Sequence, residues 1–286
     1  LSLDKTKDVN ALKSFLGDHK GILSYKMDGL TVVLTYNNGE LAQAVTRGNG
    51  EIGEDITHNA RFFRNIPLKI DFKEELVLRG EAVISFKDFR IINEDLPPED
   101  KYKNPRNLCS GTVRQLNSEI SAKRNVNFIA FALFKAEGKD FGDDKNERFA
   151  WLESMGFECV ERKEVTSDNI EAAVREFEDK IPHNPYATDG LVLTFSSVEY
   201  SESLGTTAKF PRDSIAFKWA DELAETHLTD VIWNTSRTGL INPIAVFEPV
   251  ELEGTTVERA SLHNLSIVEN LKLGIGDKIT VYKANM

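Results

Sequence analysis

The sequence predicts an α+β protein in which antiparallel sheets with flanking helices are followed by a small β-barrel. Strand-like segments are joined by hairpin turns, and helix-like segments alternate with them, which disfavours a doubly wound parallel sheet. After Trp219 the sequence pattern changes to short strand-like segments separated by Gly and Pro, as in small barrels. The length of 286 residues suffices for roughly two domains. We expect the boundary near residues 219–228, dividing a domain at 1–219 from a second at 220–286.

The first elements are predicted from local signals. Apolar residues at helical spacing favour a helix over residues 8–16, and Gly17 provides its stop. Two β-rich segments, 30–36 and 41–47, flank Asn37-Asn38-Gly39, a typical hairpin turn. The chain therefore begins with a helix followed by a two-stranded hairpin.

The later elements follow from apolar runs and from helix caps. Further strands are expected at 76–79, 82–84, 127–134, 191–195 and 215–219, and further helices at 147–155 and 168–180. Asp168 and Glu171 have the spacing of a capping box at the start of the last helix.

Composition limits the class of protein. With 41% hydrophobic and 28% charged residues, the chain is an ordinary globular protein, not a disordered, collagen-like or coiled-coil one. It contains no apolar run of about 18 residues, so we expect no membrane partner. Its two cysteines have no metal-binding spacing, which disfavours a zinc finger or disulfide framework and favours a reducing, cytoplasmic location. The net charge of −11 argues against non-specific coating of nucleic acid.

Positive charge is concentrated in residues 101–124. This segment has six bases and one acid, a net charge of +5 within an acidic chain; the bases are Lys101, Lys103, Arg106, Arg114, Lys123 and Arg124. Charge alone favours a solvated surface over a phosphate-binding one.

Lys26-Met27-Asp28-Gly29 precedes a predicted strand and is a candidate nucleophile motif. A lysine between apolar residues can be partly desolvated, which favours the neutral, nucleophilic amine. A carboxylate two residues on could orient that amine or hold a metal. Taken alone, the four residues fit a turn with a solvated lysine at least as well.

Further motifs follow in order along the chain. They are Thr46-Arg47-Gly48-Asn49-Gly50, Gly53-Glu54-Asp55-Ile56-Thr57, Leu78-Arg79-Gly80-Glu81, Asn104-Pro105-Arg106-Asn107, Arg114-Gln115-Leu116, Asp189-Gly190-Leu191-Val192, Ala216-Phe217-Lys218, Leu262-His263-Asn264 and Gly276-Asp277-Lys278. In this order and spacing the chain closely resembles the NAD⁺-dependent DNA ligases of bacteria. The blocks around Arg47 and Arg106 resemble the NAD⁺ type more than ATP-dependent ligases.

The resemblance implies a fold and an activity. It implies a nucleotidyltransferase (adenylation) domain followed by an OB-fold barrel that stops before closure. It implies lysyl-AMP formation from NAD⁺, AMP transfer to the 5′-phosphate of a DNA nick, and sealing by the 3′-hydroxyl. The implied partners are NAD⁺ or AMP, Mg²⁺ or Mn²⁺, and nicked double-stranded DNA, bound by a monomer.

The resemblance also assigns roles to individual residues. The catalytic residues would be Lys26, Asp28 and Lys218, with Lys26 as nucleophile. Nucleotide contacts would come from Ser24, Lys26, Arg47, Glu54, Glu81, Arg106, Arg114, Phe131, Thr194 and Lys218. In these roles Glu81 would bind the ribose and Phe131 would stack on adenine. We expect no dedicated metal cage, with Mg²⁺ held by Asp28 and phosphates. Because phosphoryl transfer needs positive charge around the phosphate, the segment 101–124 now favours phosphate contacts.

The chain departs from the family pattern in the adenine pocket and in extent. The family usually has Glu at position 24 and Lys at position 194, where this chain has Ser24 and Thr194. A buried ion pair exchanged as a whole for two hydroxyls costs little, whereas losing one partner leaves a stranded charge. The family's N-terminal nicotinamide mononucleotide-binding subdomain and its C-terminal domains have no counterpart here. The alternative function is therefore a ligase-like module that binds a nucleotide or nicked DNA with weak or no turnover.

Overall fold

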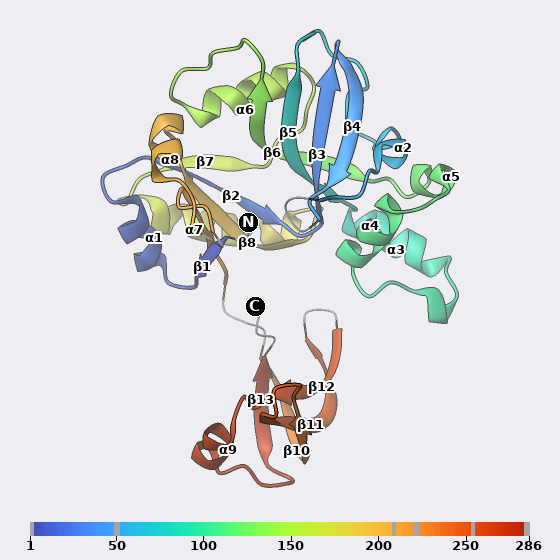
Figure 1. Ribbon diagram of the computed structural model, residues 1–286, viewed down its shortest axis with the longest axis vertical. Coiled ribbons are helices and arrows are strands. Elements are labelled where there is room, and N and C mark those ends of the chain that lie inside the picture. The colour runs from blue at the N-terminus through green and yellow to red at the C-terminus, as the bar shows by residue number, and fades with distance from the viewer. Residues whose placement is uncertain (1–2, 49–51, 208–209, 220–222, 253–254, 283–286) are drawn as a thin grey trace. The chain divides into compact units, whose positions relative to one another are not determined.

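The chain divides into two compact units, Leu1–Trp219 and Ala220–Met286. Figure 1 shows the computed structural model, which describes residues 3–48, 52–207, 210–219, 223–252 and 255–282. Asn49 and Gly50 of the Arg47 motif lie outside these residues. The two units are described separately below.

A five-stranded sheet forms one half of the larger unit. Its strands are β1 (Asp4–Thr6), β9 (Ser214–Phe217), β8 (Thr188–Phe195), β2 (Gly21–Met27) and β7 (Arg162–Val165), in that order, and only the β1–β9 pair is parallel. Helices α1 (Val9–Leu16) and α7 (Ile170–Lys180) pack against one face of this sheet. There the Tyr25 hydroxyl donates to the carbonyl of Phe177 at 3.0 Å. Because side chains alternate along a strand, Ser24 and Lys26 point to the opposite face.

A four-stranded antiparallel sheet forms the other half. Its order is β4 (Glu40–Thr46), β3 (Leu30–Asn37), β5 (Leu76–Val83) and β6 (Asn127–Ala136). The β3–β4 turn has Asn38 at φ 52° and Gly39 at φ 76°, which the predicted Asn-Gly turn requires. Four helices follow strands of this sheet: α2 (Thr57–Ala60), α3 (Phe86–Glu94), α4 (Pro105–Val113) and α5 (Ser118–Ala122).

The two sheets are joined through the backbone before β7. The N–H of Ala130 on β6 donates to the carbonyl of Glu158 at 2.8 Å, and the Val160 N–H donates back to Ala130 at 2.9 Å. The N–H of Tyr25 on β2 donates to the carbonyl of Glu161 at 3.4 Å. Side chains of both sheets share one buried cluster, which includes Ile22, Leu193, Val83 and Ile129. Helices α6 (Lys145–Ser154) and α8 (Val198–Leu204) complete the unit.

The smaller unit is a four-stranded antiparallel sheet with one described helix. The order is β12 (Thr255–Ser261), β11 (Ile241–Leu252), β10 (Leu223–Thr235) and β13 (Lys278–Tyr282), and the helix is α9 (Leu265–Leu271). Leu228 and Phe247 pair across β10 and β11 and are buried in its core. The expectation of short strands is wrong for β10 and β11, which have 13 and 12 residues. None of the helices in the described part of the chain combines the length and apolar composition that a membrane crossing needs.

Several expected boundaries differ from the structure. The strand expected after the Lys26 motif is confirmed as β3, but Lys26 and Met27 themselves lie in β2, a strand that was not predicted. The segments 76–79 and 82–84 form the single strand β5. The capping box at Asp168 is wrong, because Asn169 is the N-cap of α7 and its side chain accepts from the Thr166 N–H.

Candidate active site

Lys26 and Lys218 share one carboxylate. The Lys26 amine contacts both oxygens of Asp189, at 2.6 and 2.8 Å, and the Lys218 amine lies 3.1 Å from Oδ2. These residues come from β2, from the start of β8 and from the end of β9, which are neighbouring strands. The exposed fractions of the three side chains are 30% for Lys26, 26% for Asp189 and 17% for Lys218. Asp189 therefore holds two cations at one end of the three central strands of the sheet.

Asp28 contacts an arginine and not the Lys26 amine. Its Oδ1 accepts from Nη1 of Arg106, the second residue of α4, at 2.7 Å. Of the two roles expected for Asp28, orienting the amine is taken by Asp189, and holding a metal stays a prediction. Gly29, the next residue, allows the backbone of this turn to approach β5 closely, because a Cβ at Gly29 would lie 2.1 Å from the carbonyl oxygen of Ala82. The turn after β2 thus reaches the four-stranded sheet.

Glu81 lies towards the end of β5, facing the same turn. Its carboxylate accepts from the Gly29 N–H at 3.2 Å and from the Thr31 hydroxyl at 2.9 Å. Burial raises the pKa of Glu81 to about 7, although these hydrogen bonds and the charges of Lys26 and Arg106 oppose the shift. The structure therefore brings Glu81 together with Lys26, Asp28 and Arg106.

Two other predicted phosphate ligands form a separate pair near the end of β4. The Arg114 guanidinium bonds to the Glu54 carboxylate, and both side chains are more than 40% exposed. Arg47 follows β4 and is exposed, and its backbone N–H donates to the Thr31 carbonyl at 3.1 Å. Thr31 links this group to Glu81, its cross-strand partner.

The basic segment is divided between two roles. Arg106 and Arg114 pair with the carboxylates named above. Arg124 instead holds the fold, because its guanidinium donates to the Thr112 hydroxyl at 3.2 Å and lies over the Tyr102 ring. Sequence charge alone does not separate these roles.

Ser24 and Thr194 lie on the sheet face that carries Lys26. In register, Ser24 pairs with Val192, and Thr194 pairs with Ile22, one row further from Lys26. The Ser24 hydroxyl lies 3.5 Å from the Val192 carbonyl. Phe131 of β6 is half-buried against the same cluster of apolar side chains as Ile22. The register therefore places Ser24, Thr194 and Lys26 on one face of the sheet.

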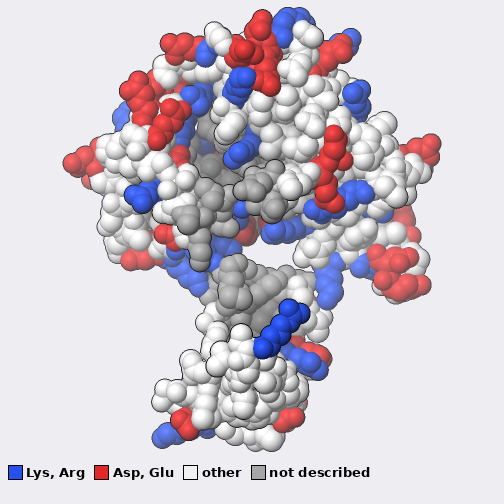
Figure 2. All heavy atoms as spheres, viewed as in Figure 1, with Lys and Arg blue, Asp and Glu red and all other residues white. Residues whose placement is uncertain are grey.

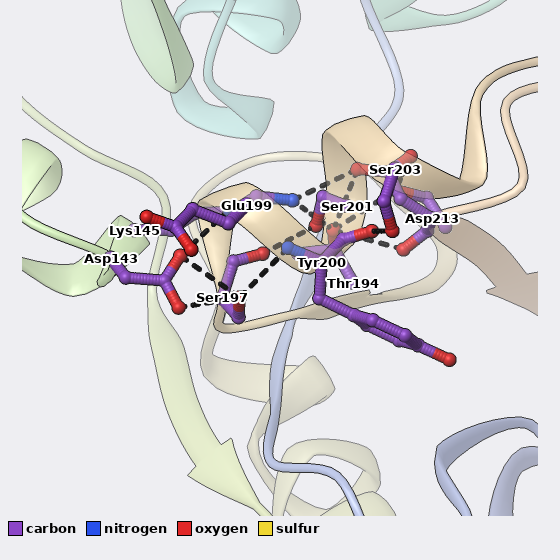
Figure 3. Close-up of polar contacts among 10 residues, drawn as sticks. Asp143, Lys145, Thr194, Ser197, Glu199, Tyr200, Ser201, Ser203 and Asp213 are labelled. Carbon is purple, nitrogen blue, oxygen red and sulfur yellow. Dashed lines mark hydrogen bonds and ion pairs between the residues drawn. The ribbon is translucent and has the colours of Figure 1, made fainter.

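A lysine that the sequence did not single out lies at Thr194. Lys145, the first residue of α6, donates from Nζ to the Thr194 hydroxyl at 2.8 Å and to Oδ2 of Asp213 at 2.9 Å (Figure 3). Neither Lys145 nor Asp213 belongs to any of the motifs above. Asp189, in contrast, stands within the Asp-Gly motif, and that motif could have marked it.

The described residues contain no cluster of three or more His, Cys, Asp or Glu side chains that could hold a metal ion. Mg²⁺ commonly binds through one or two carboxylates together with substrate phosphates. Asp28, a single carboxylate beside Arg106, fits that mode of binding.

Comparisons with known proteins cover both units. Residues 1–222 match the NAD-dependent DNA ligase adenylation domain, and residues 225–286 match the NAD-dependent DNA ligase OB-fold domain. The whole chain is 61% identical to proteins named DNA ligase from Lachnoclostridium phytofermentans and from Ruminiclostridium cellulolyticum, and covers 44% of each. A DNA ligase of Clostridioides difficile is 37% identical over 96% of the chain and 41% of its own length.

The fold is also found among solved structures. One, described as "DNA binding with a minimal scaffold: Structure-function analysis of Lig E DNA ligases", has a TM-score of 0.55 and 16% identity over 98% of this chain and 91% of that one. This likeness supports the α+β ligase fold with its OB-fold unit. The chain spans less than half the length of the curated relatives it matches. Both family matches cover motifs quoted above, and the chain belongs to the NAD-dependent DNA ligase family, of which it holds the adenylation domain and the OB-fold domain.

Proposed function

We propose that this chain is the adenylation core of a protein that seals nicks in DNA with NAD⁺, and that Lys26 is the residue adenylylated. The observation that carries the proposal is the contact of the Lys26 amine with both oxygens of Asp189. It fixes the amine at a strand end, beside a second cation, Lys218. A positioned amine surrounded by positive charge is what attack on a phosphate requires.

In the first step the Lys26 amine attacks the adenylyl phosphorus of NAD⁺. A nitrogen–phosphorus bond forms, and the bond from phosphorus to the bridging oxygen breaks, releasing nicotinamide mononucleotide. The amine must lose a proton, and Asp189 offers an acceptor at 2.6 Å. Lys218 then neutralises charge on the phosphoryl oxygens. Transfer of AMP to the 5′-phosphate of a nick and attack by the 3′-hydroxyl would follow.

The arginines would hold phosphates by exchanging partners. Arg106 and Arg114 each bond a carboxylate, those of Asp28 and Glu54, and a phosphate can replace a carboxylate in the same guanidinium fork. The exposure of both arginine side chains makes that exchange inexpensive, since exposed ion pairs contribute little.

The remaining predicted contacts concern the nucleoside and the metal. Glu81 would accept hydrogen bonds from the ribose, and Phe131 would stack on adenine. A divalent cation, Mg²⁺ or Mn²⁺, would be held by Asp28 and the phosphates, and would supply further neutralisation of phosphate charge.

Nicked double-stranded DNA is the proposed partner of a monomer acting in the cytoplasm. Acidic and basic side chains are mixed over the face of the larger unit in Figure 2, in keeping with the net charge of −11. Binding would therefore depend on local contacts at the nick more than on overall charge. Both cysteines are free thiols, which suits a reducing compartment.

Intact-mass measurement after incubation with NAD⁺ and Mg²⁺ tests the proposal, with the chain joined to the nicotinamide mononucleotide-binding subdomain of the family. The wild-type chain should gain one AMP, whereas Lys26→Ala and Lys26→Arg should gain none, since a guanidinium remains protonated and does not attack. Lys163→Ala is the matched control. This β7 lysine bonds Glu176 of α7, on the helix-covered face of the sheet and away from Lys26. An adduct on Lys26→Ala would refute the assignment. Tight AMP binding without any wild-type adduct would support the binding module instead.

A further inference from the structure

Lys145 is held in a polar cluster at the far end of the candidate nucleotide site. Its backbone N–H donates to the Ser196 carbonyl at 2.9 Å, which fixes the start of α6 at the end of β8. Its side chain is 19% exposed, and the Asp213 side chain is 23% exposed. The Ser214 hydroxyl contacts both the Thr194 hydroxyl and Oδ1 of Asp213, at 3.1 and 3.0 Å.

One donor of the Lys145 ammonium group is available. An ammonium group has three N–H donors. Two of them have acceptors, Thr194 and Asp213, and the third has no acceptor among the described residues. A cation that is largely buried gains from a further acceptor, because its own solvation is reduced. The spare donor therefore favours a ligand that offers a lone pair.

The position of this donor follows from strand register. Lys26, Ser24 and Ile22 succeed one another on one face of β2, so the Ile22 row lies roughly 13 Å from Lys26 at the usual rise per residue. Thr194 pairs with Ile22 in that row, and Ser214 pairs with Thr194 on the far side. Lys145 thus sits at the opposite end of the face from the proposed nucleophile, a separation that a nucleoside monophosphate can span.

We propose that Lys145 recognises the base of the adenine nucleotide, donating its third N–H to an unprotonated ring nitrogen. The proposal rests on the proposed function. The family pattern that the sequence resembles usually has a lysine at position 194, and this chain has Thr194. Lys145 brings an ammonium group to the same place from α6, and Asp213 and the Thr194 hydroxyl orient it. The pocket has then kept its cation while changing the element that supplies it.

Exchange of the two lysines tests this proposal. AMP affinity is measured by calorimetry, and thermal stability is measured alongside, for wild type, Lys145→Met and the double variant Lys145→Met/Thr194→Lys. Lys13→Met is the matched control, because Lys13 is also partly buried and bonds a single carboxylate, Glu171, on the helix-covered face. We expect Lys145→Met to weaken AMP binding about tenfold or more, the effect of losing a hydrogen bond from a charged donor. The double variant should recover most of that loss, and Lys13→Met should not change affinity.

Each result decides between base recognition and a structural ion pair. Equal affinities for Lys145→Met and Lys13→Met overturn the proposal. The proposal is also overturned if AMP affinity falls in proportion to thermal stability in Lys145→Met and if the added Thr194→Lys change does not restore that affinity. The wild-type adduct with NAD⁺ is measured separately, so failure of Lys26 adenylylation is distinguished from failure of base recognition by Lys145.

Discussion

Asp189 bonds the Lys26 amine through both of its carboxylate oxygens, although 163 residues separate the two in the chain. The contact is made between neighbouring antiparallel strands, β2 and β8. Lys218 bonds the same carboxylate from β9. A single anion therefore fixes the separation of two cations that would otherwise repel each other.

Removing that anion should slow adenylylation more than it weakens nucleotide binding. In Asp189→Asn the two amines lose their shared partner, and the acceptor for the proton of Lys26 is gone. We expect the rate of AMP addition, followed by intact mass, to fall about a hundredfold. Asp179→Asn, which changes an exposed carboxylate on α7, is the control. An unchanged rate in Asp189→Asn would show that the carboxylate only stabilises the fold.

Arg106→Ala should separate activity from stability. The Arg106 and Asp28 side chains are 55% and 28% exposed, so their pair should contribute less than about 1 kcal/mol to the free energy of unfolding. The rate of adduct formation should nevertheless fall, because a phosphate ligand is lost. Chemical denaturation and mass measurement check the two effects. Arg175→Ala, which breaks an exposed pair with Glu171, should change neither, and a large loss of stability in Arg106→Ala would contradict this division.

Glu81 should make the stability of the larger unit fall as pH rises. Its pKa is about 7 in the folded chain against an ordinary value of 4.5, so the folded state binds its proton more tightly. The stabilisation is complete below pH 4.5 and is lost as pH rises to about 7. Glu81→Gln lacks this titration and should be more stable than wild type by about 3 kcal/mol at pH 8, with little difference at pH 4.

Unfolding curves across this pH range check the prediction, with Glu137→Gln as the control at an exposed position after β6. Parallel pH profiles for wild type and Glu81→Gln would mean that Glu81 titrates normally. The same variant should bind AMP more weakly if Glu81 holds the ribose.

Gly190→Ala should destabilise the unit and displace Asp189. Gly190 has φ 139°, and a Cβ there would lie 2.2 Å from the Phe217 carbonyl oxygen, so β9 would have to move. Gly156→Ala is the matched control, because Gly156 has φ 91° but open space around its Cβ position. Backbone strain should cost each variant about 1–3 kcal/mol, with the larger loss at Gly190. Equal losses of stability would show that the close approach to β9 relaxes freely.

Local sequence signals predicted those helices and strands whose ends are set by residues close in the sequence. The β3–β4 hairpin was predictable because Asn38 and Gly39 accept a positive φ that few other residues adopt. Helix α4 was not predicted, since Gly111 and Thr112 are weak helix formers. It forms because Asn104 caps its first turn and Leu108 is buried against the sheet.

The site was predictable only where a motif marks it. The motifs indicated Lys26, Asp28, Glu81 and Arg106, and the structure brings these four residues together. The Asp-Gly motif could have marked Asp189, but its contact with the Lys26 amine depends on the pairing of β2 with β8, which no local pattern predicts. Lys145 stands in no motif, and only the docking of α6 on β8 brings it to Thr194.

The hydrogen bonds of Ala130, Val160 and Tyr25 before β7 join the two sheets that carry the proposed nucleotide contacts. The two sheets are one continuous backbone-bonded structure, so they cannot separate like the jaws of a hinge without breaking main-chain bonds. A nucleotide that enters therefore meets a site assembled during folding, and its binding energy is not spent on bringing the sheets together. The amides of Ala130 and Val160 should consequently exchange with solvent as slowly in the free chain as in the nucleotide complex.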